Sequence, residues 1–338
     1  MQFRTLPVIR NEEGSIRKVG FELEYANVGI DESLQIVKEL YGGEIEKEHR
    51  FSQKIVNTSI GDFSIKIDLK LLNEKTYKKL FDTFNIDLKN IKLGERTLED
   101  DVEETLEKVI NKVIPYEIGT PPVPVTEIEQ FEKLRKALHE HHAEGTKSFI
   151  TNAFATHINP ELPATDPGTI IRYIQAFLVL YPWLLRAGKT DFARRVTSFI
   201  NPYPASYIKL VLPADYSPGL ETLIDDYHQH NPDRNRPLDM YPLFAALRPE
   251  QVNTFDDLGN VKPRKTFHYR LPNSLISQPD WTLAHEWNNW VVIEELANAP
   301  EQLRKLCDDY LALKEETLMS FESKWVTHIE HEFISRKV

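Results

Sequence analysis

The chain has 338 residues, of which 41% are hydrophobic and 28% are charged, as in an ordinary soluble globular protein. Its 52 acidic and 41 basic residues give a net charge of −11, which disfavours binding to nucleic acid or to an anionic membrane surface. The single cysteine, Cys307, excludes an internal disulfide and a cysteine-cluster metal site. The N-terminal segment has no apolar run typical of a signal peptide, and the most apolar stretch, 176–185, is too short to span a bilayer. We therefore expect a reduced, cytoplasmic protein with no nucleic-acid or membrane partner.

Four segments alternate polar and apolar residues with the period of a β-strand. In the first segment, residues 19–25, the alternation places Glu22 and Glu24 on one face and three apolar side chains on the other. The other three segments present polar pairs in the same way: Lys66 and Asp68 in 62–69, His157 and Asn159 in 148–159, and His268 and Arg270 in 265–271. One such pair is typical of a solvated sheet face. Carboxylates, imidazoles and a guanidinium on four strands together favour a functional face.

Helix signals follow the same order along the chain. We expect a helix capped by Asp31 and stopped at Gly42, and another opened by a capping box at Thr126 and Glu129. Further helices are predicted from Asp166 to about Arg186, from Ser217, and from about Trp281 onward as two helices with a break near 298–300. The proline-rich segments 115–124, 202–218 and 232–249 predict irregular connections.

This order of elements predicts an α+β fold, an antiparallel sheet backed by helices, in one domain over residues 1–338. Its parts are a sheet-rich region (1–160), a mostly helical region (161–260), a late strand (264–272) and C-terminal helices (281–336).

The polar side chains suit one kind of chemistry. Glu22 and Glu24 have the same sign and lie about 7 Å apart on one strand face, which is unfavourable without a cation nearby. Carboxylate oxygens are the ligands that Mg²⁺ prefers, and Lys66, Arg264 and Arg270 would supply phosphate contacts. This is the inventory of nucleotide-dependent phosphoryl transfer. The sequence has no glycine-rich phosphate loop, no His-Glu-x-x-His and no Gly-x-Ser-x-Gly motif.

Several segments in chain order resemble the glutamate–cysteine ligase-like carboxylate–amine ligases, and in particular their amidoligase branch. The resemblance rests on Val-Gly-Phe-Glu-Leu-Glu-Tyr at 19–25, the Gly-Asp-Phe segment at 61–68, Pro-Tyr-Glu-Ile-Gly-Thr-Pro-Pro at 115–122, Thr-His-Ile-Asn-Pro-Glu at 156–161, Asn-Pro-Asp-Arg-Asn-Arg at 231–236 and Phe-His-Tyr-Arg-Leu-Pro-Asn at 267–273. The family implies a glutamine-synthetase-like fold, with the antiparallel sheet curved around the active site and helices outside. It also implies an ATP-dependent joining of a carboxylate to an amine through an acyl phosphate.

The resemblance also implies roles for single residues. Matched to the motifs, Glu22, Glu24 and Glu117 would bind Mg²⁺, His157 would lie at the nucleotide–metal site with Asn159 beside it, and Arg270 would meet phosphate. We expect Lys66, Arg236 and Arg264 to join Arg270 on the phosphate side, although the segment around Arg236 is also typical of a capped turn.

The sequence departs from the family at one position. His268 stands where glutamate–cysteine ligases carry a metal-binding glutamate, and a neutral imidazole is a poor Mg²⁺ ligand. Either Asp68 supplies the missing carboxylate, which we favour, or one metal site is lost. His268 is then a candidate general base, an orienting hydrogen-bond donor, or a structural histidine.

Three functions are compatible with these residues. The first is an ATP- and Mg²⁺-dependent amidoligase acting on an amino-acid or peptide carboxylate and an amine, with a glutamine amidotransferase-like partner implied by association. The second is an inactive relic that only binds a peptide or nucleotide, and the third is a Mg²⁺-dependent hydrolase of phosphate esters. The intact carboxylates favour the ligase, because buried like charges cost stability where no cation binds.

Overall fold

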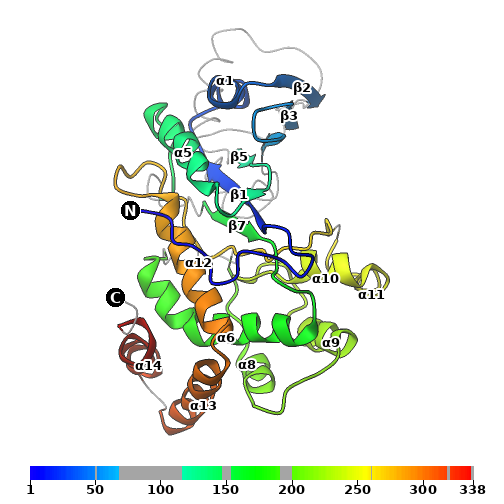
Figure 1. Cartoon of the computed structure of the whole chain (residues 1–338), viewed down its shortest axis with the longest axis vertical. Coiled ribbons are helices and arrows are strands. Elements are labelled where there is room, and N and C mark those ends of the chain that lie inside the picture. The colour runs from blue at the N-terminus through cyan, green and yellow to red at the C-terminus, as the bar shows by residue number, and fades with distance from the viewer. Residues whose placement is uncertain are drawn as a thin grey trace, which may run out of the picture.

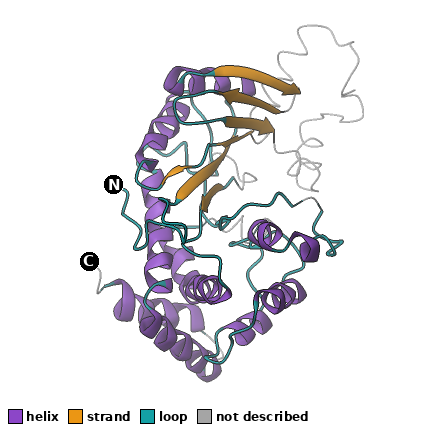
Figure 2. Ribbon diagram, turned by 45° about the vertical axis from the view of Figure 1, so that its right-hand side comes forward, coloured by secondary structure: helices purple, strands orange, loops and turns teal. Residues whose placement is uncertain are grey.

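The computed structural model describes residues 1–49, 52–67, 116–146, 154–190, 200–259, 261–317 and 320–335. Figure 1 shows the sheet in the upper half of the molecule, with α6, α13 and α14 in the lower half. In Figure 2 the strands stack at one end, and helices line their side and the region below. The expected mixed α+β architecture with an antiparallel sheet is confirmed. The sheet is open and does not curl into a barrel.

The sheet has seven strands in the order β2-β3-β4-β5-β1-β6, with β7 also paired to β1, and the pairings are antiparallel. The strands are β1 (Lys18–Tyr25), β2 (Glu44–His49), β3 (Ser52–Val56), β4 (Phe63–Ile67), β5 (Tyr116–Gly119), β6 (Val123–Pro124) and β7 (Thr156–Pro160). The predicted strands at 19–25, 62–69 and 148–159 are present as β1, β4 and β7 within the described residues. Residues 68–69 and 148–153 lie outside them.

Two predictions about the sheet were wrong. The segment 115–124, expected to be an irregular connection, holds β5 and β6, because its prolines flank the short strands and leave 116–119 able to pair with β1 and β4. The segment 264–272, expected to be a regular strand, is held only by isolated bridges to β7 and the following turn, such as Ile158 to Tyr269. The bridges still preserve the predicted alternation of faces.

The helices are α1 (Ile30–Tyr41), α5 (Phe131–Glu140), α6 (Pro167–Ala187), α8 (Ala205–Val211), α9 (Leu220–His230), α10 (Tyr241–Leu247), α11 (Pro249–Val252), α12 (Leu283–Ala297), α13 (Pro300–Glu316) and α14 (Phe321–Ile329). Short 3₁₀ and π turns, η1 (Ile128–Gln130) and η2 (Glu330–Ile334), accompany them. The C-terminal region thus has one helix more than predicted, because the chain breaks again between α13 and α14.

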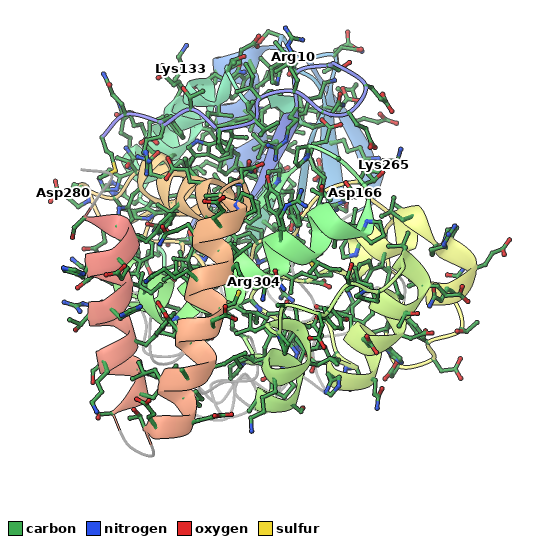
Figure 3. The ribbon with its side chains drawn as sticks, turned by 60° about the horizontal axis from the view of Figure 1, so that its bottom comes forward. Arg10, Lys133, Asp166, Lys265, Asp280 and Arg304 are labelled. Carbon is green, nitrogen blue, oxygen red and sulfur yellow. The ribbon has the colours of Figure 1, made fainter. Side chains whose placement is uncertain are left out.

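The predicted helix caps were partly right. Asp166 caps α6 as expected, accepting a hydrogen bond from the Thr169 backbone N–H at 2.9 Å, and Figure 3 shows it at the start of that helix. Asp31 instead lies inside the first turn of α1, which Gly29 caps. The capping box at Thr126 is also absent, because the chain makes the turn η1 before α5 begins.

The helix α6 is the structural centre of the lower half. It packs against α12, α13 and α14. Pro182 removes one backbone N–H inside the helix, and the indole of Trp325 on α14 donates to the Val179 carbonyl at 2.7 Å in the same turn region. Within the described residues it is the one helix long and apolar enough to cross a membrane, but 72% of that stretch is buried inside the protein, as in a soluble core.

Cys307 on α13 is fully buried, and burial raises the pKa of its thiol to about 12. Because the thiolate is the reactive form, we expect no reaction between the folded protein and Ellman's reagent at pH 8. One thiol per chain should react after unfolding in guanidinium chloride. Rapid labelling of the native protein would contradict this placement of α13.

Candidate active site on the polar face of the sheet

The strand register gathers the predicted acidic residues on one face. Glu22 on β1 lies opposite His157 on β7 and opposite Gly119 on β5. Glu24 lies opposite Glu117, which in turn lies opposite Lys66 on β4. Because paired positions in an antiparallel sheet point to the same side, these side chains share one face. Fully buried apolar side chains such as Phe21 and Leu23 lie on the other face.

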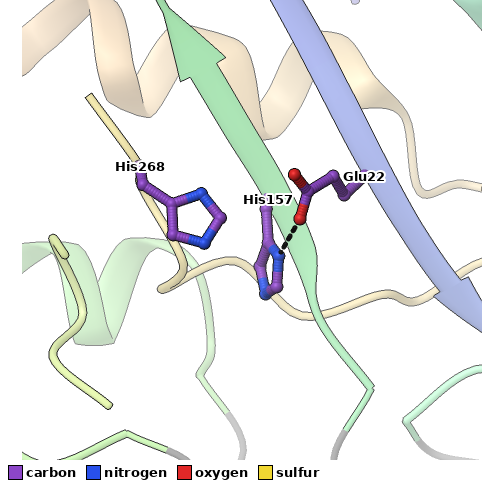
Figure 4. Close-up of side chains that lie close together, drawn as sticks. All are labelled: Glu22, His157 and His268. Carbon is purple, nitrogen blue, oxygen red and sulfur yellow. Dashed lines mark hydrogen bonds and ion pairs between the residues drawn. The ribbon is translucent and has the colours of Figure 1, made fainter. Parts of the chain in front are cut away.

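Glu22 is held by three donors. Its Oε2 lies 2.9 Å from His157 Nδ1 (Figure 4), and its Oε1 accepts hydrogen bonds from Asn159 Nδ2 at 3.1 Å and from Arg264 at 2.8 Å. Burial alone raises the pKa of this carboxyl, but the hydrogen bond from His157 and the charge of Arg264 bring the pKa well below its usual range. Glu22 is therefore ionised at neutral pH.

Glu24 and Glu117 are almost completely buried beside Glu22. Glu24 Oε2 accepts the Ala155 backbone N–H at 2.7 Å, and Glu24 Oε1 lies 3.6 Å from His157 Nε2. Glu117 forms an ion pair with Lys66 at 2.9 Å. The imidazole of His157 thus lies between two carboxylates, and the third faces a lysine. Asp68, the other predicted carboxylate, lies outside the described residues.

His268 completes the cluster from the segment that bridges to β7. Because the Glu22 carboxylate only accepts hydrogen bonds, Asn159 must turn its Nδ2 toward Glu22 and its Oδ1 toward His268 Nδ1, 2.5 Å away. His268 Nδ1 therefore carries a proton, and Nε2 keeps its lone pair. Burial is the main cause that lowers the pKa of His268 well below its usual range, and Arg270 and Arg264 lower it further, so the ring is neutral.

The predicted basic residues have different surroundings. Arg264 contacts Glu22 directly. Arg270 donates to the Arg234 carbonyl and, at 3.5 Å, to Asn235 Oδ1.

Arg236 lies apart from the carboxylates. Its guanidinium donates to the Pro202 carbonyl at 2.7 Å and pairs with Asp233 at 3.3 Å. These are the contacts of a residue that fastens two loop segments together, the turn role that the sequence left open.

Three residues on or beside this face were not singled out from the sequence. Gly119 forms part of its floor, where a Cβ atom would lie 2.5 Å from Ser64 Oγ, and its place in the alternation of Tyr116–Gly119 could have revealed it. Asp239 and Arg234 pair at 3.2 Å next to His268 and Arg270, and no local pattern in the sequence points to that contact.

The donor set fits a divalent cation. Glu24 and Glu117 offer carboxylate oxygens directly across from each other, which suits a hard cation such as Mg²⁺. Ligand atoms of Glu22, His157 and His268 lie within 4.8 Å of one another, a distance that one ion could bridge. The mixed oxygen and nitrogen donors of that second group also suit Mn²⁺ or Zn²⁺.

Comparison with known proteins gives one result. The family model described as "Putative amidoligase enzyme" matches residues 15–292, which is more than half of the chain and includes every residue of the cluster above. No curated protein and no solved structure matches the chain. The segments that resembled amidoligases in sequence are those that the strand register brings to one face. The chain therefore belongs to this amidoligase family.

Proposed function

We propose that the protein is an ATP- and Mg²⁺-dependent carboxylate–amine ligase that forms an amide bond through an acyl phosphate. Membership of the amidoligase family supports an amide-bond ligase. One observation carries the finer proposal: three buried glutamates and two histidines share a sheet face that is bordered by arginines and a lysine. Acidic side chains for a cation, beside basic side chains for phosphate, suit phosphoryl transfer. A glutamine-synthetase-like fold belongs to the same proposal.

The proposed reaction has two steps. A substrate carboxylate oxygen attacks the γ-phosphorus of ATP, and ADP leaves. The amine then attacks the acyl carbon, the bond from carbon to the phosphate oxygen breaks, and inorganic phosphate leaves. Bound Mg²⁺ would neutralise charge on the phosphates, held by Glu22, Glu24 and Glu117.

Other residues of the face have proposed roles in the same steps. Arg264, Arg270 and Lys66 would contact phosphate oxygens, and His157 with Asn159 would border the nucleotide. We propose His268 Nε2 as the acceptor of the proton that the amine loses, because its Nδ1 proton is held by Asn159. The substrates would be amino acids or peptides, and a glutamine amidotransferase-like partner stays a prediction.

A screen of carboxylates and amines tests the proposal. Purified protein with ATP and Mg²⁺ should release phosphate, and form an amide detectable by mass spectrometry, only when a suitable pair is present. The variant Glu117→Gln should give neither product. Phosphate release that ignores both substrates would favour a hydrolase instead, and ATP binding without any turnover would favour the inactive relic.

The variant His268→Gln separates the two steps. Glutamine can still donate a hydrogen bond to Asn159 but cannot accept the amine proton, so we expect acyl-phosphate formation to persist and amide formation to collapse by about 100-fold. Positional isotope exchange in ATP without amine reports the first step, and product formation reports the second. Loss of both steps together would instead place His268 at the nucleotide–metal site.

A further inference from the structure

Two irregular segments extend the polar face beyond β7. Tyr269 bridges to Ile158 on β7 and, on its other side, to Leu238. The Asp239 backbone N–H donates to the His268 carbonyl at 3.0 Å, and the Arg270 N–H donates to the Pro237 carbonyl at 2.9 Å. Because Tyr269 and Leu238 are buried in the core, the alternation turns their neighbours toward the polar face. Asp239 therefore lies next to His268 on the same face as Glu22.

Asp239 is fully buried among cationic groups. Its Oδ2 accepts a hydrogen bond from Arg234 Nε at 3.2 Å, and its Oδ1 accepts the Tyr241 backbone N–H at 3.0 Å. Burial raises the pKa of this carboxyl, while the charges of Arg234 and Arg270 act in the opposite direction. Arg270 also donates to the Arg234 backbone carbonyl, so the two arginines are joined through the main chain as well.

The charge of this group distinguishes it from an ordinary ion pair. With Asp239 ionised, two guanidinium groups share one carboxylate, which gives a net charge of +1 in a chain whose total is −11. The Asp239 side chain is wholly enclosed, whereas a quarter of the Arg234 side chain is exposed. A buried carboxylate is costly, and this one fixes the orientation of a guanidinium whose far end reaches the surface.

We infer that Arg234 is a further phosphate-binding residue of the site, with Asp239 as the positioning residue that orients it beside Arg270. This inference rests on the proposed function, and its ligand class is the oligophosphate chain of a nucleoside triphosphate. Planar guanidinium groups bind phosphate oxygens in pairs, and two of them held at a fixed separation can contact adjacent phosphates.

Charge substitutions test the inference through the affinity for ATP, measured by calorimetry with Mg²⁺ present. Arg234→Gln reduces the charge of the group to zero, so we expect about tenfold weaker ATP binding. Asp239→Asn raises the charge to +2, so ATP should bind at least as tightly as to wild type, with a steeper salt dependence. The double variant restores +1 and should recover most of the lost affinity. Adenosine, which has no phosphates, should bind equally to all four proteins.

Two further variants guard against indirect effects. Arg234→Lys keeps the charge without the fork of donors, and its ATP affinity should fall between those of wild type and Arg234→Gln. Arg186→Gln removes the same charge from the surface pair with Glu330, 3.6 Å apart on α6 and η2, and should leave ATP affinity unchanged.

The outcomes separate the two proposals. If wild-type protein binds ATP and Arg234→Gln binds it equally well, the inference is wrong and the proposed function stands. An equal loss of ATP and adenosine affinity in Arg234→Gln would likewise make Arg234 merely structural. If wild-type protein binds no ATP at all, the proposed function and this inference fail together.

Discussion

Replacing Glu22 by glutamine is expected to lower amide formation by more than about 100-fold. Outer-shell partners of a metal ion typically contribute roughly 10- to 100-fold, and a direct ligand should contribute more. Glu22 also orients His157 and Asn159 by accepting a hydrogen bond from each. A glutamine could accept only through one oxygen, and its NH₂ group would face a donor. The measurement is steady-state product formation at saturating ATP and Mg²⁺.

The same variant should be less stable than the wild type. Two neighbouring glutamates on one strand suggest repulsion that the substitution would relieve. The structure instead shows that the partners of Glu22 lower its pKa, so the ionised form stabilises the fold above the ordinary carboxyl pKa, and this stabilisation is lost as pH falls through the lowered value. We therefore expect a lower melting temperature at pH 7. The exposed residue Glu129 supplies the control, since Glu129→Gln should change neither activity nor melting. An active Glu22→Gln enzyme would remove Glu22 from the site.

The largest expected loss of stability comes from a residue outside the site. Arg17 and Glu294 form an ion pair at 2.6 Å with both side chains fully buried. Arg17 also donates to the Val8 and Glu161 carbonyls, and Glu294 accepts from the Trp290 indole, so the network joins the N-terminal segment, β1 and α12. Arg17→Met would leave the carboxylate buried without its partner. We expect the free energy of unfolding to fall by about 3–5 kcal/mol, measured by urea denaturation.

An exposed pair gives the matched control. Arg4 and Glu295 also join the N-terminal segment to α12, at 2.5 Å, but the Arg4 side chain is 40% exposed. Arg4→Met should cost less than about 1 kcal/mol, because water screens the pair and solvates the remaining carboxylate. Similar losses for Arg4→Met and Arg17→Met would show that burial does not determine the cost.

The faces of the strands could be predicted, but their neighbours could not. Alternation places Glu22 and Glu24 on one face of β1 and His157 with Asn159 on one face of β7, because the period of a strand is a local property. Register is not local: nothing in the sequence pairs Glu24 with Glu117. The role of Glu117 came only from the family resemblance, since its strand is four residues long between prolines.

The irregular segments mark where sequence patterns stop being informative. His268 and Arg270 alternate as expected, although their segment forms only isolated bridges. The pairing of Arg234 with Asp239 depends on how the loop 231–240 folds back onto that segment through backbone hydrogen bonds. Such contacts join residues about 30 positions apart, and no composition or period encodes them.

A crystal structure with Mn²⁺ and a non-hydrolysable ATP analogue would test the central claim most directly. Manganese replaces magnesium in oxygen-rich sites, and its anomalous scattering locates it without ambiguity. We predict an anomalous peak about 2.1 Å from carboxylate oxygens of Glu24 and Glu117, with the analogue's phosphates between that ion and Arg270. A structure in which Mn²⁺ and the analogue bind elsewhere, with these two carboxylates contacting neither, would contradict the claim that this face is the catalytic site of an ATP-dependent ligase.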